Sequence, residues 1–379
     1  PTVPVYDIKI KNSDLVVATH GRSFWILDDF SPLREIKPTQ NKIQIFTPKD
    51  TVRTRLAWSA GSSFTKEGIN YGPAFGIGGA SEMTVLSNGK KVRRYLDVGE
   101  NPPNGALIHY FLPADFAGEF ELSIFDSKDR LVKAYKVGKN NAVSNNSPST
   151  NIGLNRFVWN LKHQGPTTLD ASLDERKNKP LAQKSDEIEG PTVAPGRYAV
   201  VLQSDGTSIQ THFNVLMDPR LKIAKNALEK QLALLQKLYA SLSNLNVAVN
   251  QMRQVKRRLL EIDKSLTSKH ATLKARSSSI LEKLKEIEIS LIDPKRESHR
   301  DVLRHSGGLS DSLTDLISLV SIGDEAPTSQ AIAVSQEVID KVNEKIASLE
   351  SILKKDLISF RATLMKSDLT TLESNLLLV

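Results

Sequence analysis

The sequence predicts a multidomain protein that combines β structure with α structure, and two observations carry this prediction. Up to about residue 216 the apolar residues form short runs separated by turn residues, which is typical of antiparallel strands. From Asp218 onward apolar residues recur every three or four positions, which indicates amphipathic helices. The chain has 379 residues, which is enough for about two or three domains of ordinary size.

Residues 1–38 predict three short strands, with the sequences "PVYDIKI", "DLVVATH" and "SFWILDD". Asn12-Ser13-Asp14 is a turn cluster, and Gly21 supplies the backbone freedom that the second hairpin turn needs. A sheet of three short strands has almost no core of its own, so it must pack against other structure, in this chain or outside it. Phe24 and Trp25 are expected to pack there rather than to form a ligand platform.

Residues 39–95 are rich in glycine around "GINYGPAFGIGGASE". This stretch lacks the Gly-Lys-Ser/Thr ending of a phosphate-binding loop, so we expect an ordered linker. Four aromatic residues are expected to hold the linker to a neighbouring surface, with stacking on a glycan as the alternative. They are Trp58, Phe64, Tyr71 and Phe75.

Residues 96–216 contain six strand-length runs and predict an immunoglobulin-like antiparallel β-sandwich without its disulfide. The runs are "GALIHYFLP", "GEFELSIFD", "RLVKAYKV", "GLNRFVWNL", "GRYAVVLQS" and "SIQTHFNVL". Several alternate with period two, as in Phe120, Leu122 and Ile124. Residues 163–194 are polar and lack Phe, Tyr and Trp, so we expect a long excursion between two strands.

Residues 217–379 predict a C-terminal antiparallel helical bundle. Four apolar stripes at helical spacing run through residues 228–262, 273–291, 309–320 and 339–353. Thr328 or Ser329 is the expected N-cap of the last helix. The polar connections are short, which favours an up-and-down bundle over an open coiled coil.

The net charge is +8 and the sequence pI is near 9.3. The densest basic run, Arg253, Lys256, Arg257 and Arg258, has acidic residues close behind it. This pattern favours a solvated helix face over an anion or nucleic-acid contact. We therefore expect no nucleic-acid partner. We also expect no membrane span, because no apolar run approaches the roughly 20 residues that a bilayer requires.

The residues that carry chemistry form no recognisable constellation. The absence of cysteine excludes disulfides, thiolate metal sites and cysteine nucleophiles. No two of the seven histidines have the i, i+4 spacing of a helical zinc site, and there is no Gly-x-Ser-x-Gly elbow. We expect no metal, no cofactor and no catalytic residues in this chain.

Four residues near the second hairpin are the candidate ligand-binding residues: Asp28, Asp29, His20 and Arg22. Neighbouring carboxylates in a strand point to opposite faces, so the two aspartates are not a ready acid/base pair. A structural role is favoured for both, at the turn or edge that follows the strand. For His20 and Arg22, hydrogen bonds to backbone carbonyls are favoured over contact with an anionic ligand group.

"DLVVATHGRSFWILDDFSPLREI" resembles the end of the β-propeller in bacterial proteins with sortilin-type BNR (Asp-box) repeats, which are described as glycosyl hydrolase-like. "GENPPNGALIHYFLP" resembles the entry into the Ig-like sandwich that follows in this family, and a helical region comes last. Residues 1–38 would then be the final strands of a truncated propeller. The Asp-box turn is degenerate, because Thr19 stands where the aspartate belongs when Gly21 is aligned.

The resemblance implies a non-catalytic C-terminal segment of an exported protein, extracellular or periplasmic. It would brace a propeller that binds glycan or peptide, and its partners would be the upstream blades. One alternative is the tail of a glycoside hydrolase whose active site lies in those blades, so the enzymatic nature of the parent stays open. The other alternative is a structural protein-interaction module. The resemblance also implies that the chain is a fragment.

Overall fold

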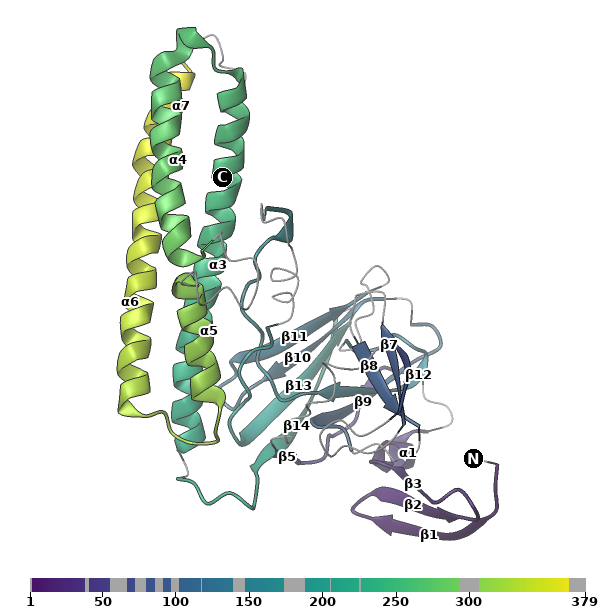
Figure 1. Cartoon of the computed structure of the whole chain (residues 1–379). Coiled ribbons are helices and arrows are strands. Elements are labelled where there is room, and N and C mark those ends of the chain that lie inside the picture. Colours follow the sequence, from purple (N-terminus) through teal and green to yellow (C-terminus); the bar gives the residue numbers. More distant parts are fainter. Residues whose placement is uncertain are drawn as a thin grey trace. The chain divides into compact units, whose positions relative to one another are not determined.

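The computed structural model describes most of the chain in twelve segments. They are residues 2–37, 41–54, 67–71, 80–85, 91–96, 102–116, 118–138, 147–173, 188–204, 206–224, 226–293 and 307–367. The chain divides into two compact units, which we call the β unit and the helical unit. The β unit comprises Pro1–Lys162 and Pro195–Lys222, and the helical unit comprises His163–Ala194 and Ile223–Val379 (Figure 1).

The N-terminal part of the β unit is a three-stranded antiparallel sheet in the order β1-β2-β3. Its strands are β1 (Val5–Lys11), β2 (Asp14–Thr19) and β3 (Phe24–Leu27), followed by the short helix α1 (Ser31–Glu35). Asn12 and Ser13 have φ of 51° and 65°. Two central residues with positive φ form a tight hairpin turn whose backbone twist matches the twist of the flanking strands. Gly21, with φ of 74°, supplies the second turn. The three predicted strands are confirmed.

Phe24 and Trp25 do not pack into a core. Their exposed fractions are 71% and 51%, so the expectation that they would be buried is wrong for this structure. The reason is that no described residue covers the broad faces of the sheet at these positions. Strand β1 is likewise exposed along its whole length.

Two further sheets form the core of the β unit, a five-stranded sheet of order β11-β10-β13-β14-β5 and a three-stranded sheet of order β12-β9-β4. The strands are β4 (Gln44–Ile45), β5 (Thr51–Arg53), β9 (Ala106–Leu112), β10 (Phe120–Phe125), β11 (Leu131–Val137), β12 (Gly153–Trp159), β13 (Gly196–Ser204) and β14 (Thr207–Met217). All six strand-length runs predicted in residues 96–216 are strands. All pairings are antiparallel except that of β14 with β5.

Aromatic side chains join the two sheets. Trp159 of β12 is fully buried, and its ring centroid lies 5.7 Å from that of Tyr198 and 6.1 Å from that of Phe213 in the other sheet. Alternation with period two puts Phe120, Leu122 and Ile124 into the same core. The sheets therefore share one apolar interior.

The expected linker, residues 39–95, contributes strands instead. β4 and β5 each add an edge strand to one of the two core sheets, because the edges of those sheets offer unpaired backbone groups. β6 (Gly68–Asn70), β7 (Ser81–Val85) and β8 (Lys91–Tyr95) form a third small sheet. Of the four aromatic residues, Tyr71 is 80% exposed. The other three, Trp58, Phe64 and Phe75, lie outside the described residues.

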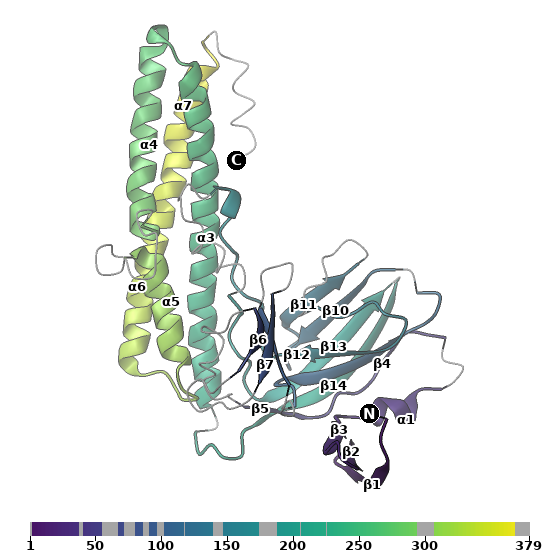
Figure 2. The ribbon, with the colours of Figure 1, turned by 45° about the vertical axis from the view of Figure 1, so that its right-hand side comes forward.

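The helical unit is built from helices that pack around one apolar core, as the four stripes predict (Figure 2). The helices are α3 (Ala227–Ser265), α4 (Ala271–Leu291), α5 (Gly308–Ser321) and α6 (Ser329–Ser351). Thr328 is confirmed as the N-cap of α6, since its hydroxyl accepts a hydrogen bond from Ala331 N at 3.1 Å. Past α6 the chain continues through a π-helical segment, η6 (Ile352–Leu357), into α7 (Ile358–Leu364).

One residue of the basic run does not lie on a solvated face. Arg253 is only 6% exposed, and its Nε donates to Glu288 Oε1 at 2.9 Å across the α3–α4 contact. Lys256 Nζ lies 3.5 Å from the other carboxylate oxygen of Glu288. The period of the helix carries Arg253 inward, next to the buried Met252, which the pattern of charges alone did not predict.

The excursion between β12 and β13 lies along α3 within the helical unit. Three polar side chains of α3, Ser243, Asn246 and Asn250, bond to its backbone. Asn246 Nδ2 donates to the Thr167 carbonyl at 2.7 Å, and the Thr167 amide donates to Ser243 Oγ at 2.7 Å. The short helix η2 (Ala171–Leu173) follows, with Leu173 buried.

Every helix in the described part of the chain is too short or too polar to cross a bilayer.

Candidate functional site

A set of charged side chains lies where the β1-β2-β3 sheet meets the sheet of β9 and β12. Asp14 begins β2, and Asp28 and Asp29 directly follow β3. Three further side chains face them: Lys49, His109 of β9 and Arg156 of β12. We call these six residues the Asp29 cluster.

Asp29 is the centre of this cluster. Its side chain is only 1% exposed and its φ is 51°, a left-handed conformation that aspartate tolerates better than most residues. The amide of Asp29 donates to Asp14 Oδ1 at 2.9 Å, and Ser31 Oγ donates to Asp29 Oδ1 at 2.6 Å. The fixed backbone therefore directs the carboxylate inward.

Three cationic or titratable groups surround the carboxylates. Lys49 Nζ donates to Asp14 Oδ1 at 2.8 Å and lies 3.6 Å from Asp29 Oδ1. His109 Nδ1 lies 3.6 Å from Asp29 Oδ2, an oxygen that has no hydrogen-bond partner among the described residues. At the edge of the cluster, Arg156 Nη2 lies 3.6 Å from Asp28 Oδ2.

Two of these groups have shifted pKa values. Burial by itself would raise the pKa of Asp14, but the hydrogen bonds from Lys49 and from the Asp29 amide lower the pKa below its ordinary value. Burial lowers the pKa of His109; the Asp29 carboxylate opposes this shift, and Arg156 and Lys49 add to it. The lowered pKa favours the neutral imidazole of His109, which lies beside a carboxylate that it does not reach with a hydrogen bond.

The Asp29 cluster is better suited to holding β3 against β9 and β12 than to catalysis. Asp29 and His109 are 4% and 6% exposed, so a substrate cannot reach the pair. Ser31 Oγ bonds to the aspartate rather than to the imidazole, so the order of a Ser-His-Asp triad is absent here. Opposite charges and backbone bonds instead connect the end of β3 to β9 and β12.

The sequence pointed to four residues in this region, and the structure brings only two of them together. Asp28 and Asp29 follow the strand, as expected for turn or edge residues, and they share the cluster. His20 lies elsewhere, with its ring 5.4 Å from that of Tyr6. The Arg22 carbonyl accepts a hydrogen bond from Trp25 Nε1 at 3.0 Å. Ligand binding by any of the four stays a prediction.

Lys49, His109 and Arg156 were missed because nothing local marks them. They lie between about 20 and 130 positions from Asp29 in the sequence, and each sits in a run that predicts only strand or loop. A lone charged residue within an apolar strand is the one available signal. His109, in "ALIHYFL", has that signal, but it does not identify the partner.

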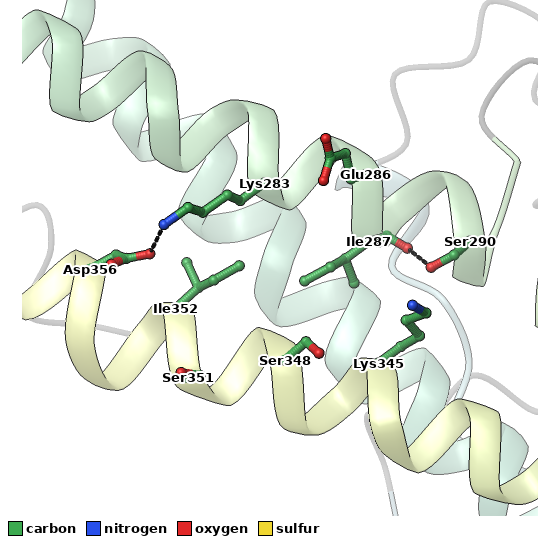
Figure 3. Close-up of a pocket in the computed structure, with 9 residues that line it drawn as sticks. All are labelled: Lys283, Glu286, Ile287, Ser290, Lys345, Ser348, Ser351, Ile352 and Asp356. Atoms are coloured by element: carbon green, nitrogen blue, oxygen red, sulfur yellow. Dashed lines mark hydrogen bonds and ion pairs between the residues drawn. The ribbon is translucent and has the colours of Figure 1, made fainter.

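A second candidate is an open groove of about 500 Å³ between α4 and the end of α6 in the helical unit (Figure 3). Ile287 and Ile352 form its apolar part, and Ser348 and Ser351 line one side. Lys283 Nζ and Asp356 Oδ2 pair at 2.6 Å at one end. The two ionic groups at that end therefore pair with each other.

Within the described residues, no group of three or more His, Asp or Glu side chains is arranged to hold a metal ion. Comparison with family models, with curated proteins and with solved structures gave no match for this chain.

Proposed function

We propose that this chain is the non-catalytic C-terminal part of an exported β-propeller protein, in which residues 1–38 complete the propeller and the remaining chain braces it. One observation carries the proposal: the apolar face of the three-stranded sheet. Strand pairing places six apolar side chains side by side on this face. They are Ile8, Ile10, Leu15, Val17, Trp25 and Leu27.

The exposure of this face is unusual for a folded sheet. Ile8 and Ile10 are 55% and 58% exposed, and Trp25 is 51% exposed. Contiguous apolar patches on soluble proteins mark surfaces that pack against another partner. A β-meander whose face is apolar is what a propeller blade offers to the neighbouring blade, and this supports the resemblance of "THGRSFWILDD" to a closing blade.

The Asp29 cluster supports the bracing role. It ties the end of β3 to β9 and β12 through buried or half-buried charges, so the sheet is held by one edge while its apolar face stays open. The two antiparallel sheets that share the Trp159 core support the Ig-like sandwich that follows the propeller in the same family. The charged side chains of the cluster hold the end of β3 against β9 and β12. This structural role favours a non-catalytic segment.

The coding sequence before Pro1 gives the first test. We expect it to continue in frame into repeated strand patterns and a secretion signal. The encoded segment, expressed separately and mixed with this chain, is then expected to bind and to shift the Trp25 fluorescence to the blue. The Trp25→Phe variant is the control, because it removes the exposed indole of Trp25 and leaves Trp58 and the buried Trp159 in place.

Two results would count against the proposal. One is a start codon directly before Pro1, and the other is a mixture in which Trp25 stays exposed to solvent. If the chain alone associates with itself as its concentration rises, and Ile8→Asp abolishes that association, the structural interaction module is favoured instead.

A further inference from the structure

The net charge of the chain is concentrated at one end of the helical bundle. Residues 253–280 and 354–366, which we call the distal end, hold twelve lysines and arginines against three acidic residues. Their net charge of +9 exceeds the +8 of the whole chain, so all other residues together have a net charge of −1. The sequence run of Arg253 to Arg258 is only part of this asymmetry. Further cations follow it up to Arg276, and the others lie in residues 354–366, which are distant in sequence.

The fold brings these segments together. Arg276 of α4 donates through Nη1 to Ser359 Oγ at 3.0 Å and to Thr363 Oγ1 at 2.8 Å, which joins α4 to α7. The end of α3, the start of α4 and α7 lie at the same end of the bundle in both views (Figures 1 and 2). The charges therefore add to one local potential.

Part of this charge is compensated and part is not. Glu288 pairs with Arg253 and Lys256, and Glu350 pairs with Lys354, whereas Asp356 of the distal end pairs with Lys283 outside it. Five other lysines are exposed and have no ion-pair partner among the described residues. They are Lys264, Lys269, Lys274, Lys355 and Lys366.

An apolar stripe lies beside these lysines. Ile358 and Met365 are seven positions apart on α7 and its last turn, and they are 59% and 49% exposed. Phe360 and Leu364, on the opposite side of the same helix, are fully buried in the core. Helical spacing places Ala362 between the two exposed residues, so the outer face of α7 is apolar and is flanked by Lys355 and Lys366.

We propose that the distal end of the bundle binds the surface of a membrane that contains anionic lipids. Lysines spread over a blunt surface attract a planar array of phosphate groups without needing a shaped pocket, and a neighbouring apolar helix face adds interfacial contact. Nucleic-acid binding is less well supported, because single-strand binders stack bases on aromatic rings. Phe360, the aromatic residue of α7, is buried. This proposal does not depend on the proposed propeller.

The test is co-sedimentation of the full chain with phosphatidylcholine vesicles that contain phosphatidylglycerol, and with vesicles of phosphatidylcholine alone. We expect binding only to the anionic vesicles, and loss of that binding in high salt. Each basic residue near an anionic membrane surface contributes to the binding free energy. The double variant Lys264→Glu and Lys269→Glu is therefore expected to weaken binding to the vesicles by about tenfold or more.

The matched control reverses two exposed lysines near the start of α3, away from the distal end, Lys230→Glu and Lys237→Glu. It changes the net charge by the same amount and is expected to keep most of the binding. Circular dichroism checks that both variants keep their helices. Absence of binding to anionic vesicles in low salt, or equal loss in the two variants, would overturn the proposal. So would binding to heparin or duplex DNA without binding to vesicles.

Discussion

The three-stranded sheet and the helical bundle contain the same kinds of apolar side chain, but they use them in opposite ways. In the bundle, Leu238, Leu284 and Phe360 are fully buried, and lysines cover the outside. In the sheet, Ile8 and Trp25 face outward, while a carboxylate, Asp29, is buried. The bundle completes its own core, whereas the sheet exposes the surface on which another structure can pack.

The difference has a geometric cause. Helix α3 spans 39 residues and presents one long apolar stripe. The neighbouring helices of the same unit cover this stripe, so the bundle needs no other structure to bury it. Three strands of four to seven residues have two broad faces and too little area to cover either one. The sheet therefore has no closed core among the described residues, and the Asp29 cluster, which attaches it to β9 and β12, is polar.

The largest effect is expected from a cavity in the bundle. Phe360→Ala removes a fully buried ring and is expected to lower the free energy of unfolding by about 3–5 kcal/mol. Urea denaturation followed by helical circular dichroism measures this loss. Ile358→Ala, on the exposed face two positions away, is the control and is expected to change stability by less than about 0.5 kcal/mol. Equal effects would contradict the assignment of the two faces.

Asp29→Ala is expected to have the next largest effect. It removes the acceptor of Ser31 Oγ, leaves His109 and Lys49 without the central carboxylate, and places alanine at a positive φ. The loss is expected to be about 2 kcal/mol, because polar partners are left buried and the backbone is strained. Hydrogen exchange of the β2 and β3 amides would report it.

Asp29→Asn separates the contribution of the carboxylate charge from those of the Ser31 hydrogen bond and the backbone conformation. Asparagine tolerates the left-handed conformation and keeps one oxygen for Ser31, so only the charge is lost and the sheet should stay better protected. If Asp29→Ala leaves exchange in β2 and β3 unchanged, the Asp29 cluster does not fasten the sheet.

A smaller effect is expected from pH. The pKa of His109 is lower in the folded protein than in the unfolded chain, so the unfolded chain binds the additional proton between the two values. The stability contribution is complete above about pH 6.5, the ordinary histidine pKa, and is lost as the pH falls from there towards the folded pKa. His109→Gln should flatten this part of the melting-temperature profile. An unchanged slope in that variant would assign the pH dependence to another group.

The smallest effect on stability is expected on the apolar face of the sheet. Ile8→Thr keeps a β-branched residue in an exposed strand position, so the free energy of unfolding should change by less than about 0.5 kcal/mol. Retention on a hydrophobic-interaction column should nevertheless decrease. Ile108→Thr, in the buried β9, is the matched control and should be strongly destabilising. A large loss of stability from Ile8→Thr would mean that this face is already covered in solution.

The sequence by itself determined the local elements. Apolar spacing located the three N-terminal strands, the six strands of residues 96–216 and the four long helices, because side-chain periodicity follows directly from backbone geometry. Thr328 could be identified as an N-cap for a similar reason, since a hydroxyl before a helix satisfies an amide that has no helical acceptor.

Only the tertiary structure decided which elements meet. It recruited β4 and β5 from the expected linker, because sheet edges select any strand that can pair. It also placed His109 against Asp29, 80 positions away, and gathered lysines from three helices at the distal end. Such contacts depend on how strands and helices are arranged in space. Local periodicity determines which side of an element is apolar, and it carries no information about what will cover that side.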